Sequence, residues 1–208
     1  VADAELFING PVCPDEVLVE AVLSLKTGEV LTKDGMHIAS RPMLDEVFHS
    51  ELHKRFNVKE YSRDFIRISV PEDIFRNNDT ELRKDFALLT KGKTSVKLSG
   101  TNTFLGDEIF AEEGAGAECC TFNSLNGPIY IGQNSQVWEG CHIRGSFALC
   151  HDSQVKMGAK IYGQTTIGPF SRVGGEINNA VVWGYSSKGH EGYLGNSGVV
   201  ALSFLRKT

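Results

Sequence analysis

The fold is decided by residues 129–173, which read IYIGQNSQVWEGCHIRGSFALCHDSQVKMGAKIYGQTTIGPFSRV. Aliphatic side chains recur there at every sixth position: Ile131, Val137, Ile143, Leu149, Val155, Ile161, Ile167 and Val173. A strand has a side-chain period of two and a helix a period of about 3.6, so neither produces an unbroken period of six. A parallel β-helix does, because each flat side of its coil is one short strand plus one turn.

The residues around these aliphatics support the same coil. Small residues stand two positions before most of them: Ser135, Cys141, Ser153, Ala159, Thr165 and Ser171. Turn-forming residues follow most of them after three positions: Asn134, Gly140, Ser146, Asp152 and Gly158. We therefore predict a mainly β chain with a triangular coil of about eighteen residues, repeated over residues 95–200.

The repeat breaks between Val173 and Val182, where the step is nine residues instead of six. We interpret the extra residues as a three-residue bulge at residues 174–176. The phase is predicted to resume at Val182, Leu194 and Val200. Lys188 stands where an inward aliphatic belongs, so residues 184–192 (GYSSKGHEG) are predicted to leave the wall as a polar loop. A break in a regular repeat that is filled with Lys and His is where we expect function.

Residues 1–94 are predicted to form an incomplete α/β segment. Residues 14–16 (Pro-Asp-Glu) favour a helix start, because proline fits the first turn and acidic residues complement its dipole. An apolar stripe follows at Leu18, Val22 and Leu25, and Gly28 ends this helix. A second helix is predicted from Asn78, as its capping residue, to Gly92, and it would connect this segment to the coils.

Composition and charge narrow the function classes. A net charge of −5 argues against a general nucleic-acid surface, and no stretch approaches the length of a membrane-spanning helix. The five cysteines (Cys13, Cys119, Cys120, Cys141 and Cys150) are odd in number and lack the paired spacing of zinc sites. We expect reduced thiols in a cytoplasmic protein, no metal site, and Cys141 and Cys150 facing or flanking the coil interior. Val1 at the start and the off-pattern tail at 201–208 suggest a fragment.

Three stretches within residues 127–197 carry a specific resemblance: GPIYIG, VKMGAKIYG and TTIGPFSRVGGEINNAVVWGYSSKGHEGYLGNS. They resemble the C-terminal half of an alternative family of bacterial bifunctional enzymes, which join a sugar-1-phosphate nucleotidyltransferase to a glucosamine-1-phosphate N-acetyltransferase. LFINGPVCPDEVL and GEVLTKDGMHIASR resemble this family's pieces between the two halves. The resemblance implies a left-handed β-helix of hexapeptide repeats, a homotrimer, acetyl-CoA and Mg²⁺, and a role in making a sugar nucleotide such as UDP-N-acetylglucosamine.

The resemblance also implies roles for individual residues. His190, in the segment Lys188-Gly189-His190, matches the general base that takes the proton of the attacking amine, and Tyr193 would touch the sugar phosphate. Lys156 stands where the family has a phosphate-binding arginine. The family's lysine after position 173 is replaced by Gly174 here, so its role is either lost or passes to Arg172.

Stacking at eighteen residues predicts a basic strip on one wall, with His142, Lys160 and Asn178 in one column and Arg144 with Tyr162 in the next. Such a strip would hold a sugar phosphate or the CoA phosphates, and a solvated face is the alternative. His142 and His151 are otherwise predicted to be surface or trimer-contact residues. Trp138 and Trp183 are predicted to be packing or subunit-contact residues. Asn77 and Asn78 also resemble the asparagine pair with which nucleotidyltransferases help to bind Mg²⁺, although capping by Asn78 is preferred.

The chain departs from the family after residue 197, where the family has further coils that carry the acetyl-CoA site. The residues that would bind acetyl-CoA are therefore unknown, and this chain is expected to lack a complete site. Two alternatives stay open. One is a non-catalytic scaffold whose β-helix only trimerises the chain, and the other is a nucleotidyltransferase with a structural β-helix arm.

Overall fold

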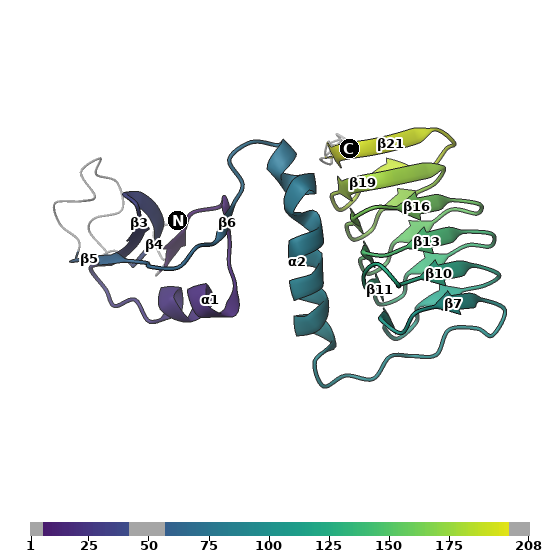
Figure 1. Cartoon of the computed structure of the whole chain (residues 1–208), viewed down its shortest axis with the longest axis horizontal. Helices are drawn as coiled ribbons and strands as arrows, with labels where there is room; N and C mark the ends of the chain where they lie inside the picture. The colour runs from purple at the N-terminus through teal and green to yellow at the C-terminus, as the bar shows by residue number, and fades with distance from the viewer. Residues whose placement is uncertain (1–5, 42–56, 200–208) are drawn as a thin grey trace, which may run out of the picture. The chain divides into compact units, whose positions relative to one another are not determined.

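The computed structural model describes residues 6–41 and 57–199 (Figure 1). The chain divides into two compact units, with the boundary between Ser69 and Val70. The predictions for Val200 and for the tail at 201–208 lie outside the described residues.

The first unit is a small α/β segment, as predicted. Its four-stranded sheet has the order β1 (Phe7–Ile8), β4 (Met36–Arg41), β3 (Glu29–Lys33), β5 (Asn57–Glu60). Strand β3 runs antiparallel to β4 and parallel to β5, and β2 (Val12–Cys13) pairs with β6 (Ile66–Arg67). The core is made of apolar side chains from the sheet and from helix α1 (Glu16–Leu23), including Leu18, Val22, Leu25, Leu31 and Ile38.

Helix α1 confirms the first predicted helix. The side chain of Asp15 caps it by accepting a hydrogen bond from the backbone N–H of Leu18 at 2.8 Å. Leu18, Val22 and Leu25 are all buried, so the apolar stripe faces the core. The predicted end at Gly28 was wrong, because the last helical residue is Leu23, Ser24 is the C-cap, and Leu25 lies beyond the helix.

Helix α2 (Glu72–Thr90) begins six residues before the predicted start. Pro71 precedes it, and Glu72 and Asp73 lie in its first turn, where acidic side chains complement the helix dipole. Asn78 therefore lies inside the helix and does not cap it, so the preferred interpretation of the asparagine pair was wrong. The acidic pair after Pro71 was the start signal that the sequence analysis overlooked.

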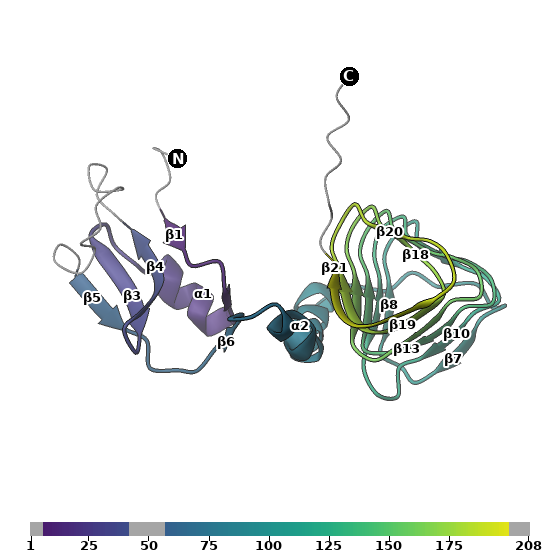
Figure 2. The same cartoon turned by 90° about the horizontal axis from the view of Figure 1, so that it is seen from above.

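From residue 96 to residue 199 the chain forms a parallel β-solenoid, which confirms the predicted fold class. Figure 2 looks along the stack of coils and shows the strands of successive coils superposed. The first wall contains β7 (Thr103–Leu105), β10 (Thr121–Asn123), β13 (His142–Arg144), β16 (Lys160–Tyr162), and the first parts of β19 (Glu176–Val182) and β21 (Tyr193–Val199). The left-handed sense of the coil stays a prediction.

The other two walls complete each coil. The second wall contains β8 (Ile109–Ala111), β11 (Ile129–Ile131), β14 (Phe147–Leu149), β17 (Thr165–Ile167) and the later parts of β19 and β21. The third wall contains β9 (Gly116–Ala117), β12 (Gln136–Val137), β15 (Gln154–Val155), β18 (Arg172–Val173) and β20 (Ser187–Lys188). Neighbouring strands in every wall are parallel, which aligns side chains in columns from coil to coil.

The predicted interior is confirmed. All eight aliphatic residues on the six-residue spacing are at most 2% exposed, from Ile131 to Val173. A serine ladder (Ser135, Ser153 and Ser171) runs up one corner. Each hydroxyl donates to a carbonyl of the next coil, and each accepts from the backbone N–H of a serine above it. The hydroxyls of these three serines are thereby paired without water, whereas the buried hydroxyl of Ser186 at the top of the ladder has no partner among the described residues.

The predicted bulge after Val173 is not present, because the coil becomes shorter there. Ile177 lies in register above Ile161, and Val182 above Ile167, so these steps are sixteen and fifteen residues long. The shortening uses residues with positive φ, among them Gly175 at 77°. Val199 then takes the position above Val182.

Helix α2 packs along the second wall, as Figure 1 shows. Asn78 donates from its amide to the carbonyl of Gln164 and accepts from the hydroxyl of Thr166. One helical turn further on, Arg83 donates to the carbonyl of Asn126. The helix therefore belongs structurally to the solenoid unit. No helix among the described residues is long and apolar enough to cross a membrane.

Candidate functional site

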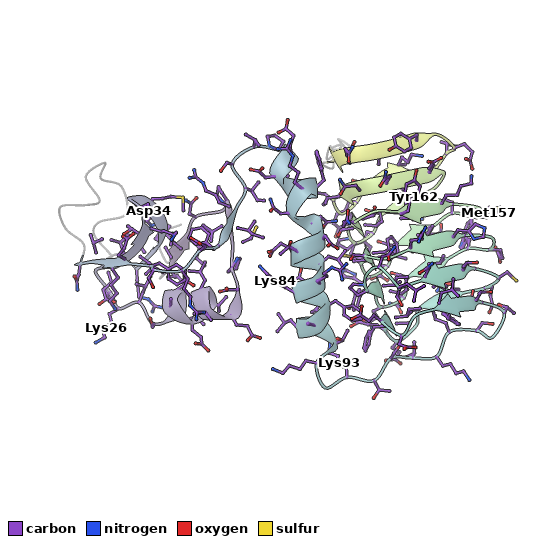
Figure 3. The ribbon with its side chains drawn as sticks, in the orientation of Figure 1. Lys26, Asp34, Lys84, Lys93, Met157 and Tyr162 are labelled. Atoms are coloured by element: carbon purple, nitrogen blue, oxygen red, sulfur yellow. The ribbon has the colours of Figure 1, made fainter. Side chains whose placement is uncertain are left out.

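The candidate site is the turn that carries His190, at the corner between the third and first walls. Strand β20 ends at Lys188 and β21 begins at Tyr193, so residues 189–192 make this turn. The side chain of His190 is exposed. Met157 lies at the same corner two coils below and faces away from helix α2 (Figure 3), where it is 60% exposed. The site is therefore open to solvent and is not covered by the helix.

The polar segment does not leave the wall as predicted. Lys188 pairs in register with Val173, and Ser187 pairs with Arg172, so strand β20 continues the third wall. The backbone N–H of Gly174 donates to the carbonyl of Lys188 at 2.8 Å. Only the turn at residues 189–192 projects, because the wall hydrogen bonds persist up to Lys188.

Lys156 faces outward from the third wall, next to Val155. Its ammonium nitrogen lies 4.3 Å from the centre of the Trp138 ring, in a cation–π contact with the coil below. A Cβ atom added at Gly174 would lie 3.0 Å from the Cβ of Lys156, so the glycine leaves room for the lysine stem. Trp138 thus contacts Lys156 and is not only a packing residue.

Arg172 lies on the outer side of the third wall, in register between Gln154 below and Ser187 above. Within the part of the chain that the structure describes, its guanidinium has no hydrogen bond or ion pair. A guanidinium carries five N–H donors in a fixed fork that suits phosphate. Arg172 is therefore available to an anion beside the His190 turn.

Tyr193 begins β21 on the first wall, in register above Glu176. Glu176 in turn lies above Lys160, and its carboxylate accepts a 2.5 Å hydrogen bond from the hydroxyl of Tyr162. This hydrogen bond, together with desolvation, raises the pKa of Tyr162. Glu176 belongs to the candidate site, but the sequence did not identify it. The only signal was the neighbouring Ile177, an aliphatic residue inside the nine-residue step that could have been recognised as an additional inward position.

The basic strip predicted on this wall is interrupted. His142 does lie beneath Lys160, as predicted, but the residue above Lys160 is Glu176 and not Asn178. Asn178 lies above Tyr162 instead, because the coil is two residues shorter here. The column is therefore of mixed charge, which weakens its attraction for phosphate.

Arg144 lies apart from the other candidates. It ends strand β13, which is three strands below β21, and neighbouring strands are about 4.8 Å apart. Tyr193 begins the strand that follows the His190 turn, and Arg172 lies in register with Ser187 on the strand that precedes it. Lys156 lies one coil below Arg172, and Arg144 lies about 14 Å below the strand of Tyr193. His151 lies at a different corner, between the second and third walls. Its ring Nδ1 is hydrogen-bonded to the carboxylate of Asp152 at 2.9 Å.

The described residues contain no group of three or more His, Cys, Asp or Glu side chains that could hold a metal ion. None of the five cysteines, all of which lie within the described residues, forms a disulfide. Cys141 is buried in the coil interior and Cys150 is half-buried. Two grooves, of about 550 and 470 Å³, lie around the first coil near Phe104 and Lys93, at the end of the stack opposite to His190.

The structure defines a two-part chain in which an α/β segment is followed by a parallel β-solenoid with a polar turn at its last coil. Residues 1–94 match the protein family described as "Sugar nucleotidyl transferase". This match covers the first unit and helix α2 and ends where the first coil begins. No curated protein matches the chain. The match covers less than half of the chain, so it is a similarity of this part of the chain to that family.

Proposed function

We propose that this chain belongs to an enzyme of sugar-nucleotide biosynthesis, and that its solenoid acetylates the amino group of an amino-sugar 1-phosphate with acetyl-CoA. The full-length first domain would couple the sugar phosphate to a nucleoside triphosphate. The match of residues 1–94 supports the sugar-nucleotide context. The observation that carries the acetyl transfer is the exposed His190 turn, flanked by Arg172 and Tyr193 on two different walls.

The chemistry requires a base at this position. The sugar amine attacks the thioester carbonyl, a C–N bond forms, and the C–S bond to CoA breaks. The amine must lose a proton as it attacks, and an imidazole can accept that proton near neutral pH. His190 supplies this group, and the CoA thiolate leaves with the electron pair of the C–S bond.

The sugar phosphate would be held by the charged side chains around the turn. Arg172 offers a bidentate donor pair, whereas Lys156 offers a point charge on a flexible stem. Lys156 would have to leave the face of Trp138 to reach upward. Tyr193 would contact the phosphate from the first wall.

Arg172 and Lys156, which lie on the same wall, are proposed for the sugar phosphate. The residues that would hold the phosphates of acetyl-CoA, which supplies the acetyl group when bound, therefore stay unassigned among the described residues. For Mg²⁺ the described residues offer no ligand cluster. We therefore derive no step through a metal ion.

We also propose the homotrimer with sites between subunits. Three large aromatic residues are exposed on the last coils at the corner between the second and third walls: Phe170 at 47%, Trp183 at 49% and Tyr185 at 75%. Exposed aromatic groups of this size are enriched at protein interfaces. Equilibrium sedimentation of the whole chain tests this proposal, and a monomer at all concentrations would contradict it.

The acetyl transfer is tested by mass spectrometry of the product from glucosamine 1-phosphate and acetyl-CoA. We expect N-acetylation by the wild type, loss of at least about 100-fold in His190→Ala, and little change in the control His151→Ala. His151 is a good control because it is an exposed histidine bonded only to its own corner. Equal rates in wild type and His190→Ala, or no product at all, would contradict the proposal and favour a scaffold.

A further inference from the structure

Lys188 occupies a position that every lower coil gives to an aliphatic side chain. The inward column of the third wall reads, from the first coil upward, Ala117, Val137, Val155, Val173 and then Lys188. The four aliphatic residues are at most 5% exposed, and Lys188 is half-buried. A charged group at such a position must find polar partners, because burying an unpaired charge is costly.

The partners of Lys188 are all backbone carbonyls. Its ammonium donates to the carbonyl of Gly174 at 2.7 Å, to that of Gly192 at 2.8 Å and to that of His190 at 2.9 Å. An ammonium group has three N–H donors, so all of them are used. Among the described residues no carboxylate pairs with it. Two of the three acceptors belong to the turn at residues 189–192.

The neighbouring backbone is shaped to admit this arrangement. A Cβ atom added at Gly175 would lie 2.9 Å from the ammonium of Lys188 and 2.8 Å from the carbonyl oxygen of Gly192. Gly175 also has a φ of 77°, which glycine adopts without strain. The shortened coil and Lys188 therefore depend on the same residue. Gly175 has no side chain, and the space that this leaves is occupied by the ammonium of Lys188.

We propose that Lys188 is a positioning residue whose ammonium acts as an internal cation that organises the turn at residues 189–192. By holding the carbonyls of His190 and Gly192 toward the wall, it fixes the backbone from which the imidazole projects. The role of His190 as the base rests on the proposed function, but the ordering of the turn does not. Because the three carbonyls bind a monovalent cation, a small alkylammonium ion should replace the side chain when it is truncated.

Amide hydrogen exchange tests the ordering directly. The backbone N–H of Glu176 donates to the carbonyl of Gly192 at 3.1 Å, so its exchange reports on the turn. In Lys188→Met, which keeps the length of the side chain but not its charge, we expect exchange at Glu176 to become about tenfold faster or more. The control Lys97→Met removes an exposed lysine from the first coil and should leave this amide unchanged.

Rescue separates an organising cation from a merely space-filling side chain. In Lys188→Ala we expect added butylammonium to restore slow exchange at Glu176, whereas Lys188→Met should not respond, because its side chain fills the same space. Circular dichroism and the melting temperature establish that each variant is folded. Wild-type exchange in a folded Lys188→Met, or a Lys188→Ala that is insensitive to the amine, would overturn the proposal.

Kinetics distinguish this proposal from the proposed function. If the wild type acetylates glucosamine 1-phosphate, Lys188→Met should lower kcat about tenfold or more and change KM for acetyl-CoA less than about twofold, since only the base is displaced. If the wild type shows no transfer, the proposed function fails, and the exchange and rescue measurements still decide the role of Lys188. An unchanged kcat in Lys188→Met with a loosened turn would overturn the positioning of His190.

Discussion

The side-chain oxygen of Asn78 accepts a hydrogen bond from the hydroxyl of Thr166 at 2.9 Å, and this contact joins helix α2 to the second wall. The amide of Asn78 also donates to the carbonyl of Gln164 at 2.8 Å. The amide group of Asn78 thus bonds two polar groups of one coil that lie 86 and 88 residues later in the chain. The helix stabilises the solenoid by these contacts as well as by packing.

We predict that Asn78→Ala destabilises the solenoid unit by about 1–3 kcal/mol, because it leaves two half-buried polar groups without their partner. The adjacent Asn77→Ala is the matched control. Asn77 bonds only to the carbonyl of Asp73 within the same helix, and alanine has the higher helix propensity. Urea unfolding of the two variants measures the difference, and equal midpoints would contradict the assigned role of Asn78.

The serine ladder predicts a second stability difference. Ser153 is 2% exposed, donates to the carbonyl of Gly168 at 2.9 Å and accepts from the N–H of Ser171 at 3.0 Å. Ser153→Ala should cost about 2–3 kcal/mol, since both partners stay buried. Ser187→Ala, at an exposed position on the same wall, should cost less than about 0.5 kcal/mol. Thermal unfolding of both variants checks the prediction, and it is refuted if Ser153→Ala melts like the wild type.

A pair of glycines tests the close packing around the His190 turn. Gly175 and Gly158 have similar positive φ values of 77° and 72°, so alanine is strained by about 1 kcal/mol at either. Only at Gly175 would the new Cβ meet other atoms, with the carbonyl oxygen of Gly192 at 2.8 Å. We therefore expect Gly175→Ala to be clearly the more destabilising of the two in urea unfolding. A smaller effect at Gly175 would mean that the turn does not pack as described.

Thiol reactivity follows from burial. Desolvation in the coil interior raises the pKa of Cys141 to about 12, so its reactive thiolate is almost absent at pH 8. Cys119 is exposed. In the native protein we expect iodoacetamide to modify Cys119 at least about 100-fold faster than Cys141, as measured by mass spectrometry of peptides. Comparable rates would show that the coil opens at Cys141.

The regular part of the solenoid could be predicted from the sequence, because its six-residue repeat depends only on residues close together in the chain. Each inward aliphatic from Ile131 to Val173 follows the last by six residues, so a period alone predicts which side chains are buried. The rule fails at residues 174–177, where the turns lose residues and Ile177 moves inward. A period cannot show whether a longer step contains a bulge or an additional inward residue, since this depends on how the coil packs on the one below.

The candidate site was predictable only in part. His190, Arg172 and Tyr193 were named as site residues from the resemblance, and their roles stay predictions. The three bonds of Lys188 and the pairing of Glu176 with Tyr162 were not predictable, because each follows from the shortened coil. The displacement of Asn178 from the column of Lys160 has the same cause.

The central claim is that the His190 turn binds an amino-sugar phosphate, and NMR of the chain with ¹⁵N-labelled histidine rings tests it most directly. The chain contains six histidines, which serve as one another's controls. We predict that glucosamine 1-phosphate shifts the ring signals of His190 in a saturable manner, that glucosamine without phosphate does not, and that Arg172→Ala weakens the effect. No shift at His190, or equal shifts at His142 and His151, would contradict the account.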